Sequence, residues 1–267
     1  MEESYVDTSK VELRPITIAL AKRMIVKYHY SHAWPASTQA PLGVFYKTGG
    51  GHKFLDNEDE KLIGCIIYGN PVGRRAAASV VNDDTMDPHK SVLELTRLFI
   101  HDGYGKNIES FVIGQSFKWL KENMPDIKLL ISYADPAQGH VGGIYKATNW
   151  GYQKAEDMKL MDNYPISLSD DPYDWIHSRT VFSRYGVTPY PTPVAVEKMK
   201  KAVGQTFWMK RECIKHRYIQ FLTDKREKRR LMKLLKHPFH PYPTEADGEE
   251  EIRKIEVEES GKFGKFI

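Results

Sequence analysis

The first two thirds of the chain alternate between stretches with a strand-like period of two and stretches with helix-like spacing of apolar residues. This pattern predicts strands at Val11–Ile16, Pro41–Lys47, Lys61–Tyr68, Val92–Ile100 and Leu129–Ile131, and two more around Lys154–Met161 and Arg179–Tyr185. It predicts helices at Thr17–Tyr28, Ile108–Glu122 and Val141–Thr148. Elements in this order are typical of an α/β (α+β) fold in which helices flank a mixed twisted sheet.

Polar stretches without a period predict loops and set the expected domain boundaries. Thr48–Glu60 suits an exposed hairpin loop, and residues 70–90 suit a mobile loop over a functional site. Beyond a stiff Pro189–Pro193 linker, helical spacing resumes through Ala195–Thr223 and Lys225–Lys236. We therefore expect a catalytic domain at residues 1–188, a helical basic extension at 189–243 and an acidic, disordered tail at 244–267.

The net charge of +4 hides a strong polarity along the chain. Residues 210–237 carry 11 Lys and Arg against 3 Asp and Glu, whereas residues 245–265 carry 8 acids against 4 bases. A local excess of one sign suggests a surface for a polyanion. Cys65 and Cys213 fall in apolar patterns and predict reduced thiols in an intracellular protein. The sequence has no run of about 18 apolar residues, so we expect no membrane span.

Residues 132–152 concentrate polar side chains where a strand gives way to a short helix. An α/β sheet binds its ligands at such strand ends. The candidates there are Ser132, Asp135, His140, Gly142, Gly143 and Tyr145. The alternative is structural, with Asp135 in a helix-entry turn and the nearby aromatic residues in the core.

Three further segments are candidates for the same site. His29 and His32, spaced to share a helical face, suit a metal or proton transfer together with Tyr30, unless this helix end merely packs on the sheet. Strand alternation places Glu94 and Arg97 on opposite faces of a central strand, where each needs a partner of opposite charge, either in a functional site or in a structural ion pair with a loop. The turn at 101–106 offers Gly103, Gly105 and Lys106 to an anion, although two glycines also suit an ordinary tight turn.

The basic segment supplies the candidate nucleic-acid contacts. These are Lys215, Arg217, Lys228, Arg229 and Arg230, together with Arg74 and Arg75 of the polar loop. Basic residues interleaved with aromatic ones can pair with phosphates while the rings pack or stack. A solvated helix face is the alternative reading of the same charges.

The run Ser-Tyr-Ala-Asp-Pro from Ser132, followed by Gly-His-x-Gly-x-Ile-Tyr-x-Ala-x-Asn-Trp ending at Trp150, resembles the Mom family of bacteriophage DNA-modification proteins. That family is a divergent branch of the GCN5-related N-acetyltransferases. The resemblance implies an acetyltransferase-like fold and a Tyr145 that protonates the leaving thiolate. It also implies an active site with His29, Tyr30 and Asp135, a metal role involving iron, and an acetyl-CoA or other acyl donor held near Arg97 and the glycine turns.

The resemblance predicts a transferase that adds a small acyl or carbamoylmethyl-type group to a base of double-stranded DNA, with the N6 amine of adenine favoured. Such a modification would protect phage DNA from restriction enzymes in the host cytoplasm. Asp135 or Glu94 would deprotonate the amine, which a flipped base would present. The alternative is an acetyl-CoA-dependent N-acetyltransferase for a protein or small-molecule amine. A DNA-binding module on an inactive transferase fold is a third possibility.

Overall fold

The computed structural model describes residues 4–48, 59–72, 75–158, 163–245 and 250–257. The chain forms two compact units, each built from more than one segment. The first unit contains residues 1–134, 141–158 and 216–244. The second contains residues 135–140, 159–215 and 245–267. This division differs from the expected boundaries because the chain leaves the first unit after residue 158 and returns at residue 216.

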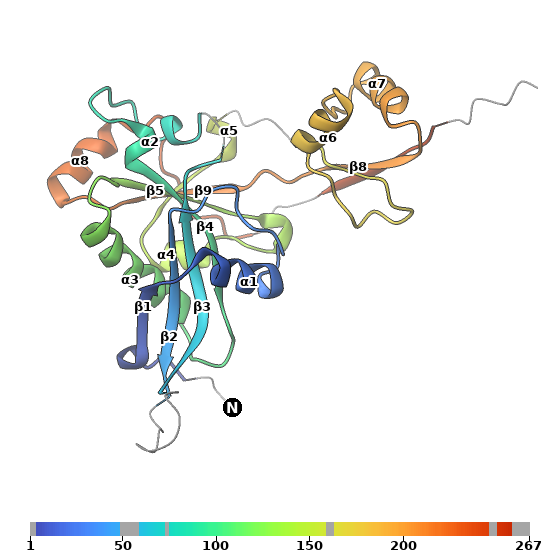
Figure 1. Cartoon of the computed structure of the whole chain (residues 1–267). Helices are drawn as coiled ribbons and strands as arrows, with labels where there is room; N and C mark the ends of the chain where they lie inside the picture. The colour runs from blue at the N-terminus through green and yellow to red at the C-terminus, as the bar shows by residue number, and fades with distance from the viewer. Residues whose placement is uncertain (1–3, 49–58, 73–74, 159–162, 246–249, 258–267) are drawn as a thin grey trace, which may run out of the picture. The chain divides into compact units, whose positions relative to one another are not determined.

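The first unit is built on a mixed sheet of seven strands (Figure 1). The strands are β1 (Val11–Pro15), β2 (Ala40–Lys47), β3 (Glu60–Gly69), β4 (Val92–Ile100), β5 (Leu129–Ala134), β6 (Gly151–Gln153) and β9 (His216–Phe221). Their order across the sheet is β1-β2-β3-β4-β5-β9-β6. All neighbours are antiparallel except β4 and β5, which run parallel. The predicted α/β fold with a mixed sheet is therefore confirmed.

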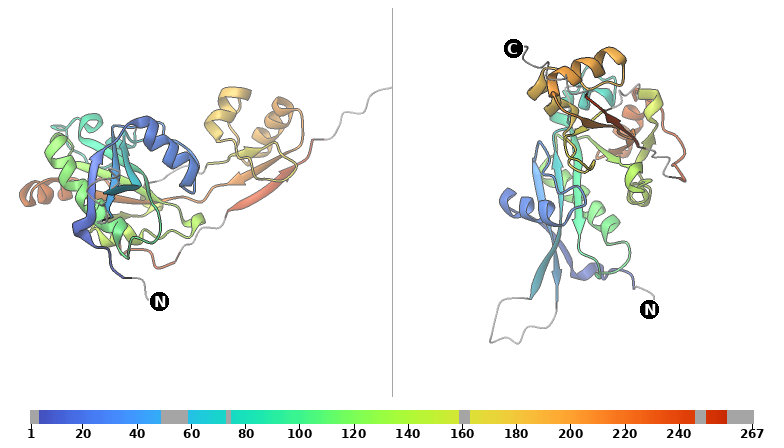
Figure 2. Two further views of the ribbon diagram at one scale, coloured as in Figure 1. Left: turned by 60° about the horizontal axis from the view of Figure 1, so that its bottom comes forward. Right: turned by 90° about the vertical axis from the view of Figure 1, so that its right-hand side faces the viewer.

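Helices cover both faces of this sheet (Figure 2). They are α1 (Ile18–Tyr28), α2 (Pro88–Ser91), α3 (Ile108–Asn123), α4 (Gly143–Ala147), α5 (Ala155–Met158) and α8 (Lys225–Lys233). On one face, α3 and α4 pack on the largest apolar cluster, which includes Leu93, Leu95 and Leu130. On the other face, α1 packs on Cys65 and Ile67. Apolar side chains from both sides therefore bury the central strands.

The second unit holds a small sheet in the order β10-β8-β7. Its elements are β7 (Ile166–Ser167), α6 (Ser178–Tyr185), α7 (Pro193–Val203), β8 (Phe207–Arg211) and β10 (Glu251–Ile255). Val181 and Met199 from the helices bury their side chains against Phe207 and Met209. Residues 251–255, expected in a disordered tail, instead pair antiparallel with β8.

Three assignments from the sequence pattern are wrong. The strand predicted at Arg179–Tyr185 is helix α6, whose first turn is capped by the His177 ring and which ends at Gly186 in the left-handed conformation. The strand predicted around Lys154–Met161 is helical over Ala155–Met158. The helix predicted through Ala195–Thr223 ends at Gly204, which adopts the left-handed conformation, and the rest of the predicted range contains β8 and β9.

Much of the predicted mobile loop at 70–90 is packed against the sheet. A 3-10 turn (Ala77–Ser79) brings Ala77, Val80 and Val81 into a buried cluster with Ile219 and Leu231. Arg217 of β9 donates from Nη1 to Ser79 Oγ over 2.6 Å. The described part of this segment therefore lacks a regular apolar period in its sequence because it forms short turns that bury residues at irregular spacing, and not because it is mobile. The hairpin loop predicted at Thr48–Glu60 lies largely outside the described residues.

Candidate active site

The parallel strands β4 and β5 diverge part-way along their length. They pair from Val92–Leu129 to Glu94–Ile131, and beyond this point each continues without pairing to the other. We call this opening the splay. A divergence of central parallel strands exposes backbone and side chains from both faces of a sheet at one place, so polar residues there can meet a ligand.

Glu94 and Arg97 face the same side of the sheet, in contrast to the alternation expected from the sequence. The register between β3 and β4 shifts at Thr96, because Leu95 pairs with Tyr68 and Arg97 pairs with Ile67. Consequently Leu95 and Leu98, three residues apart, both pack in the α3-side cluster. A β-bulge of this kind re-aims the side chains that follow it.

These two charged residues are anchored by backbone groups. Glu94 Oε2 accepts the N–H of Val72 over 3.2 Å. Arg97 donates from Nε to the carbonyl of Ala33 over 3.1 Å, which ties β4 to the segment after α1. Burial lowers the pKa of Arg97, and the charges of Tyr30 and Glu94 oppose that shift. The Arg97 guanidinium is thus partly desolvated and lies within electrostatic range of Glu94.

Ser132 and Tyr145 meet at the splay from the α4 side. Their hydroxyl oxygens lie 2.7 Å apart, and Ser132 Oγ donates to the carbonyl of Leu95 over 2.8 Å. Burial raises the pKa of Tyr145 to about 12, the Ser132 hydrogen bond lowers it, and Tyr30 and Glu94 raise it further. Tyr145 is therefore a protonated phenol at neutral pH, as a proton donor must be.

His29 and Tyr30 follow the last turn of α1. His29 is only 6% exposed, and its Nδ1 accepts the N–H of Ser31 over 3.1 Å, which places the proton of a neutral ring on Nε2. Tyr30 is 55% exposed, and its ring centroid lies 4.3 Å from that of His29. The helix ends before either histidine, so His29 and His32 do not share a helical face.

Tyr30, Glu94 and Arg97, together with the hydrogen-bonded pair Ser132 and Tyr145, lie within electrostatic range of one another at the splay, and we call these five residues the splay cluster. Tyr30 and Glu94 both influence the pKa values of Arg97 and Tyr145. The cluster combines a carboxylate that can accept a proton, a phenol that can donate one, and a guanidinium that can hold an anionic oxygen. Such a set suits transfer of a group to an amine.

Asp135 and His140 belong to the second unit, so they are described apart from the splay cluster. Asp135 Oδ1 accepts the N–H of Ala137 over 3.1 Å, and Oδ2 pairs with Lys215 Nζ at 3.1 Å. His140 is exposed, and its backbone N–H donates to the Asp135 carbonyl. Asp135 thus caps a turn, and a catalytic role for it stays a prediction.

The fit of a metal or a coenzyme is limited in the described residues. No group of three or more His, Cys, Asp or Glu side chains gathers there to hold a metal ion, so iron has no support. The Lys106 N–H donates to the Ser4 carbonyl, and a side chain at Gly105 would meet Val6 at 2.6 Å. Gly103 lies open, whereas Lys106 offers its exposed ammonium.

The two glycines before α4 differ in their surroundings. Gly142 is left-handed at φ +73°, and a Cβ there would lie 2.3 Å from the Tyr218 ring. The Tyr218 hydroxyl donates to the Val141 carbonyl just before it. Gly143 has open space around its Cα. The close approach of the Tyr218 ring therefore explains why position 142 is a glycine, and no bound ligand is needed to account for it.

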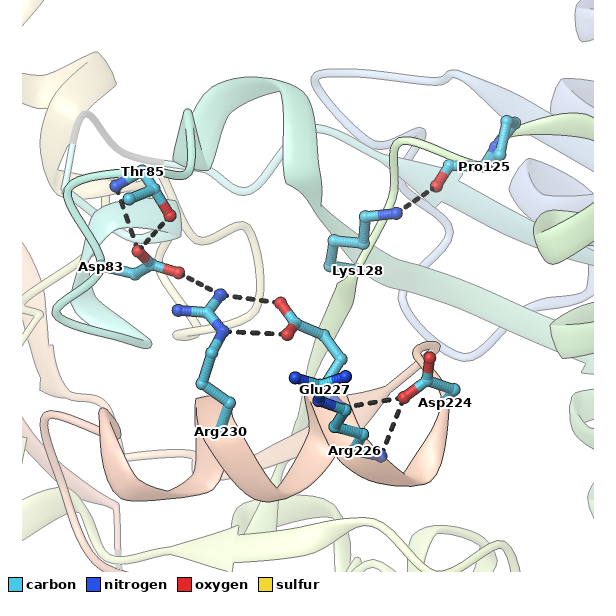
Figure 3. A network of polar contacts seen from close by, with 8 residues as sticks. All are labelled: Asp83, Thr85, Pro125, Lys128, Asp224, Arg226, Glu227 and Arg230. Carbon is cyan, nitrogen blue, oxygen red and sulfur yellow. Dashed lines mark hydrogen bonds and ion pairs between the residues drawn. The ribbon is translucent and has the colours of Figure 1, made fainter.

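The predicted nucleic-acid residues fall in different surroundings. Lys228, Arg229 and Arg230 lie on α8 and Arg75 is exposed, whereas Arg74 lies outside the described residues. Arg230 pairs with Asp83 and with Glu227, as Figure 3 shows. Lys215 pairs with Asp135. These internal pairs leave Lys228 and Arg229 as the α8 members of the set most open to a partner.

Arg217, predicted as a nucleic-acid contact, is instead buried and hydrogen-bonded within the first unit. Arg217 is 2% exposed, and its Nε donates to Gln153 over 2.9 Å. Burial lowers its pKa, and the neighbouring Tyr133 raises it. Arg217 therefore serves the interior rather than the surface. The signal available in the sequence was that Arg217 shares a strand face with the apolar Ile219 and Phe221.

Comparison with known proteins places the chain in a family. Residues 10–244 match the model of the Mom protein family. The chain is 25% identical over 244 residues to the protein named methylcarbamoylase mom of Escherichia phage Mu, covering 91% of this chain and 88% of that protein.

Solved acetyltransferases show a weaker likeness. Arabidopsis thaliana NAA60 in complex with acetyl-CoA aligns with a TM-score of 0.40 at 10% identity, covering 62% of this chain and 97% of that chain. The aminoglycoside acetyltransferase AAC(6')-Ib with coenzyme A and kanamycin aligns with a TM-score of 0.34 at 14% identity, covering 65% of this chain and 98% of that chain.

No helix in the described part of the chain is long and apolar enough to cross a membrane. The match over residues 10–244 shows that the chain belongs to the Mom protein family.

Proposed function

We propose that the chain is a DNA-modifying transferase that adds a small acyl or carbamoylmethyl-type group to a DNA base. The observation that carries this proposal is the match of residues 10–244 to the Mom protein family. The name methylcarbamoylase of the phage Mu relative supports group transfer as the reaction. The favoured target is the N6 amine of adenine, and the expected outcome is DNA that restriction enzymes no longer cut.

The splay cluster supports a direct transfer to an amine. The amine nitrogen forms a bond to the donor carbon while the bond to the leaving group breaks. Glu94 accepts the proton that the amine loses, and Tyr145 supplies a proton to the leaving group. Arg97 holds the oxygen on which negative charge develops. We favour Glu94 over Asp135 as the base because both carboxylate oxygens of Asp135 already have partners, the Ala137 N–H and the Lys215 ammonium.

The proposed partners are double-stranded DNA and a small-molecule donor, in the cytoplasm of the host cell. An acyl-CoA is the first donor to test, with Lys106 and the α3 start as its proposed anchor. Lys228 and Arg229 on α8, with Arg75, are the proposed phosphate contacts. A flipped adenine would bring its amine to the splay.

The test is mass spectrometry of nucleosides from DNA of cells that express the chain. We expect a deoxyadenosine that carries the added group, and its loss in Glu94→Gln. The matched control is Glu122→Gln, which changes an exposed carboxylate at the end of α3. Unmodified DNA together with acetylation of proteins or polyamines would instead indicate an ordinary N-acetyltransferase.

A further inference from the structure

The outward side of α1 carries positive charge that no carboxylate in the described residues neutralises. The helix contains Lys22, Arg23 and Lys27 and no acidic residue. All three side chains are exposed. The Lys27 ammonium lies 4.8 Å from the centroid of the Tyr28 ring.

The packing of α1 does not require these cations. The buried residues of the helix are Ala21, Met24 and Ile25. Arg23 and Lys27 lie one turn apart, where like charges repel each other and disfavour the helix. The helix dipole favours a cation only in the last turn, which accounts for Lys27 but not for the other two. Their presence therefore points to a partner outside the chain.

Aromatic side chains continue this surface toward the splay cluster. The Tyr28 ring stacks on Phe99 with centroids 5.5 Å apart and planes 10° apart, and Tyr28 is 42% exposed. Tyr30, two residues on, is more exposed and influences the pKa values of Arg97 and Tyr145. Cations next to exposed rings are a combination that binds nucleic acids.

We propose that Lys22, Arg23 and Lys27 bind the phosphates of duplex DNA beside the target base, as a second contact surface in addition to α8. The inference rests on the proposed function, because it takes DNA as the substrate. A flipped base needs its flanking backbone held near the reacting groups, and α1 ends beside them. The polyanionic backbone complements a helix with three cations and no acid.

An anionic membrane is the rival partner, because Ile18, Leu20 and Val26 are also exposed on α1. DNA is favoured because Arg23 and Lys27, one turn apart, continue along the helix to Tyr28 and Tyr30, whose rings are exposed. Vesicles that contain phosphatidylserine therefore belong in the test.

The experiment compares Arg23→Gln/Lys27→Gln with Lys118→Gln/Lys121→Gln, a matched pair of exposed cations on α3. Binding of a fluorescent duplex is measured by anisotropy over a range of salt, with circular dichroism as the check of folding. We expect the α1 variant to bind roughly tenfold more weakly at low salt, with a slope of log K against log salt flatter by about two units. The α3 variant should match the wild type, and yields of modified nucleoside should follow binding.

The outcomes separate the inference from the function on which it rests. If the wild type modifies DNA and the α1 variant binds and modifies it equally well, the inference alone is overturned. If the wild type neither binds duplex DNA nor modifies it, both proposals fall together. Wild-type binding to phosphatidylserine vesicles that the α1 variant loses, with DNA binding unchanged, would assign α1 to a membrane surface and overturn the DNA contact.

Discussion

The hydroxyl oxygens of Ser132 and Tyr145 lie 2.7 Å apart where β4 and β5 diverge. The Ser132 hydroxyl donates its hydrogen to the carbonyl of Leu95, so Tyr145 is the donor in the hydrogen bond between the two hydroxyls. These two hydrogen bonds connect β5 to β4 and to α4, one residue beyond the last backbone pair between the strands. To protonate a leaving group, Tyr145 must redirect its hydroxyl from Ser132, a rotation about one C–O bond.

Replacing Tyr145 with Phe should abolish transfer with little effect on folding. Loss of a proton donor reduces a rate by about 10²- to 10⁴-fold, whereas loss of one hydrogen bond costs about 1 kcal/mol of unfolding free energy. Tyr218→Phe is the matched control, because that ring stacks on Tyr145 with centroids 4.6 Å apart but points its hydroxyl at Val141. Rates and urea denaturation of both variants are the measurement. Equal rates would remove the acid role from Tyr145.

Variants of the ion pair between Asp135 and Lys215 can distinguish a catalytic role of Asp135 from a structural one. Either Asp135→Ala or Lys215→Ala removes the 3.1 Å ion pair, but only the first removes the carboxylate. If Asp135 takes part in transfer, its variant should lose activity and the Lys215 variant should keep it. Each should cost about 1 kcal/mol or less of stability from the ion pair, because Lys215 is half exposed. Parallel losses in modified nucleoside would make the carboxylate structural.

Arg230 should stabilise the fold. Its guanidinium bridges Asp83 at 2.6 Å and Glu227 at 2.7 Å, and the Asp83 side chain is only 3% exposed (Figure 3). A double-mutant cycle with Arg230→Gln and Asp83→Asn should show that the two changes are coupled. The coupling would be absent if α8 were held by its apolar face alone.

The same pair predicts how stability falls in acid. The Arg230 hydrogen bond, followed by that of Thr85, lowers the pKa of Asp83 to about 2. A lowered pKa contributes stability above the unfolded value of 3.8, and this contribution is lost as pH falls toward 2. Unfolding free energies between about pH 5 and 2 should drop more for the wild type than for Asp83→Asn.

Charge reversal on α8 should weaken DNA binding without loosening the helix. Lys228→Glu with Arg229→Glu removes cations that form no ion pair in the described residues, and each lost phosphate contact flattens the salt slope by about 0.9. Anisotropy across a salt series measures both effects. Arg230→Gln is the comparison, since it should lower stability more than affinity. Unchanged affinity in the double variant would make α8 a solvated face.

Stability should also fall at alkaline pH. Burial raises the pKa of Cys65 from 9.0 to about 12 and that of Tyr145 from 10.0 to about 12. Groups with raised pKa values contribute stability that is complete below the unfolded values and is lost as pH rises through the folded ones, each by about 3 to 4 kcal/mol. Denaturation between about pH 8 and 12 should show this loss, and Cys65→Ala should reduce it. A flat profile would mean that the thiol reaches solvent.

The strands β1 to β5 and the helices α1, α3 and α4 were predictable because their patterns are local and complete. The strand at 92–100 and the helix at 108–122 match β4 and α3 within a residue. In each segment the apolar residues recur with a single regular spacing, and this spacing indicates the backbone conformation directly. Glu94 was recognisable as a charged residue within an otherwise apolar strand and Tyr145 through the family resemblance, and the motif around Asp135 indicated the family that residues 10–244 match.

The remaining features depend on contacts between residues distant in the chain. A single bulge at Thr96 turns Arg97 to the same face as Glu94, and no periodicity marks it in advance. Strand β9 enters the main sheet between β5 and β6 although Arg217 interrupts its apolar face, because Gln153 and Ser79 accept hydrogen bonds from Nε and Nη1 of the buried guanidinium. Local spacing determines which backbone conformation a segment prefers, whereas the burial of a charge depends on partners that only the folded chain brings within hydrogen-bonding distance.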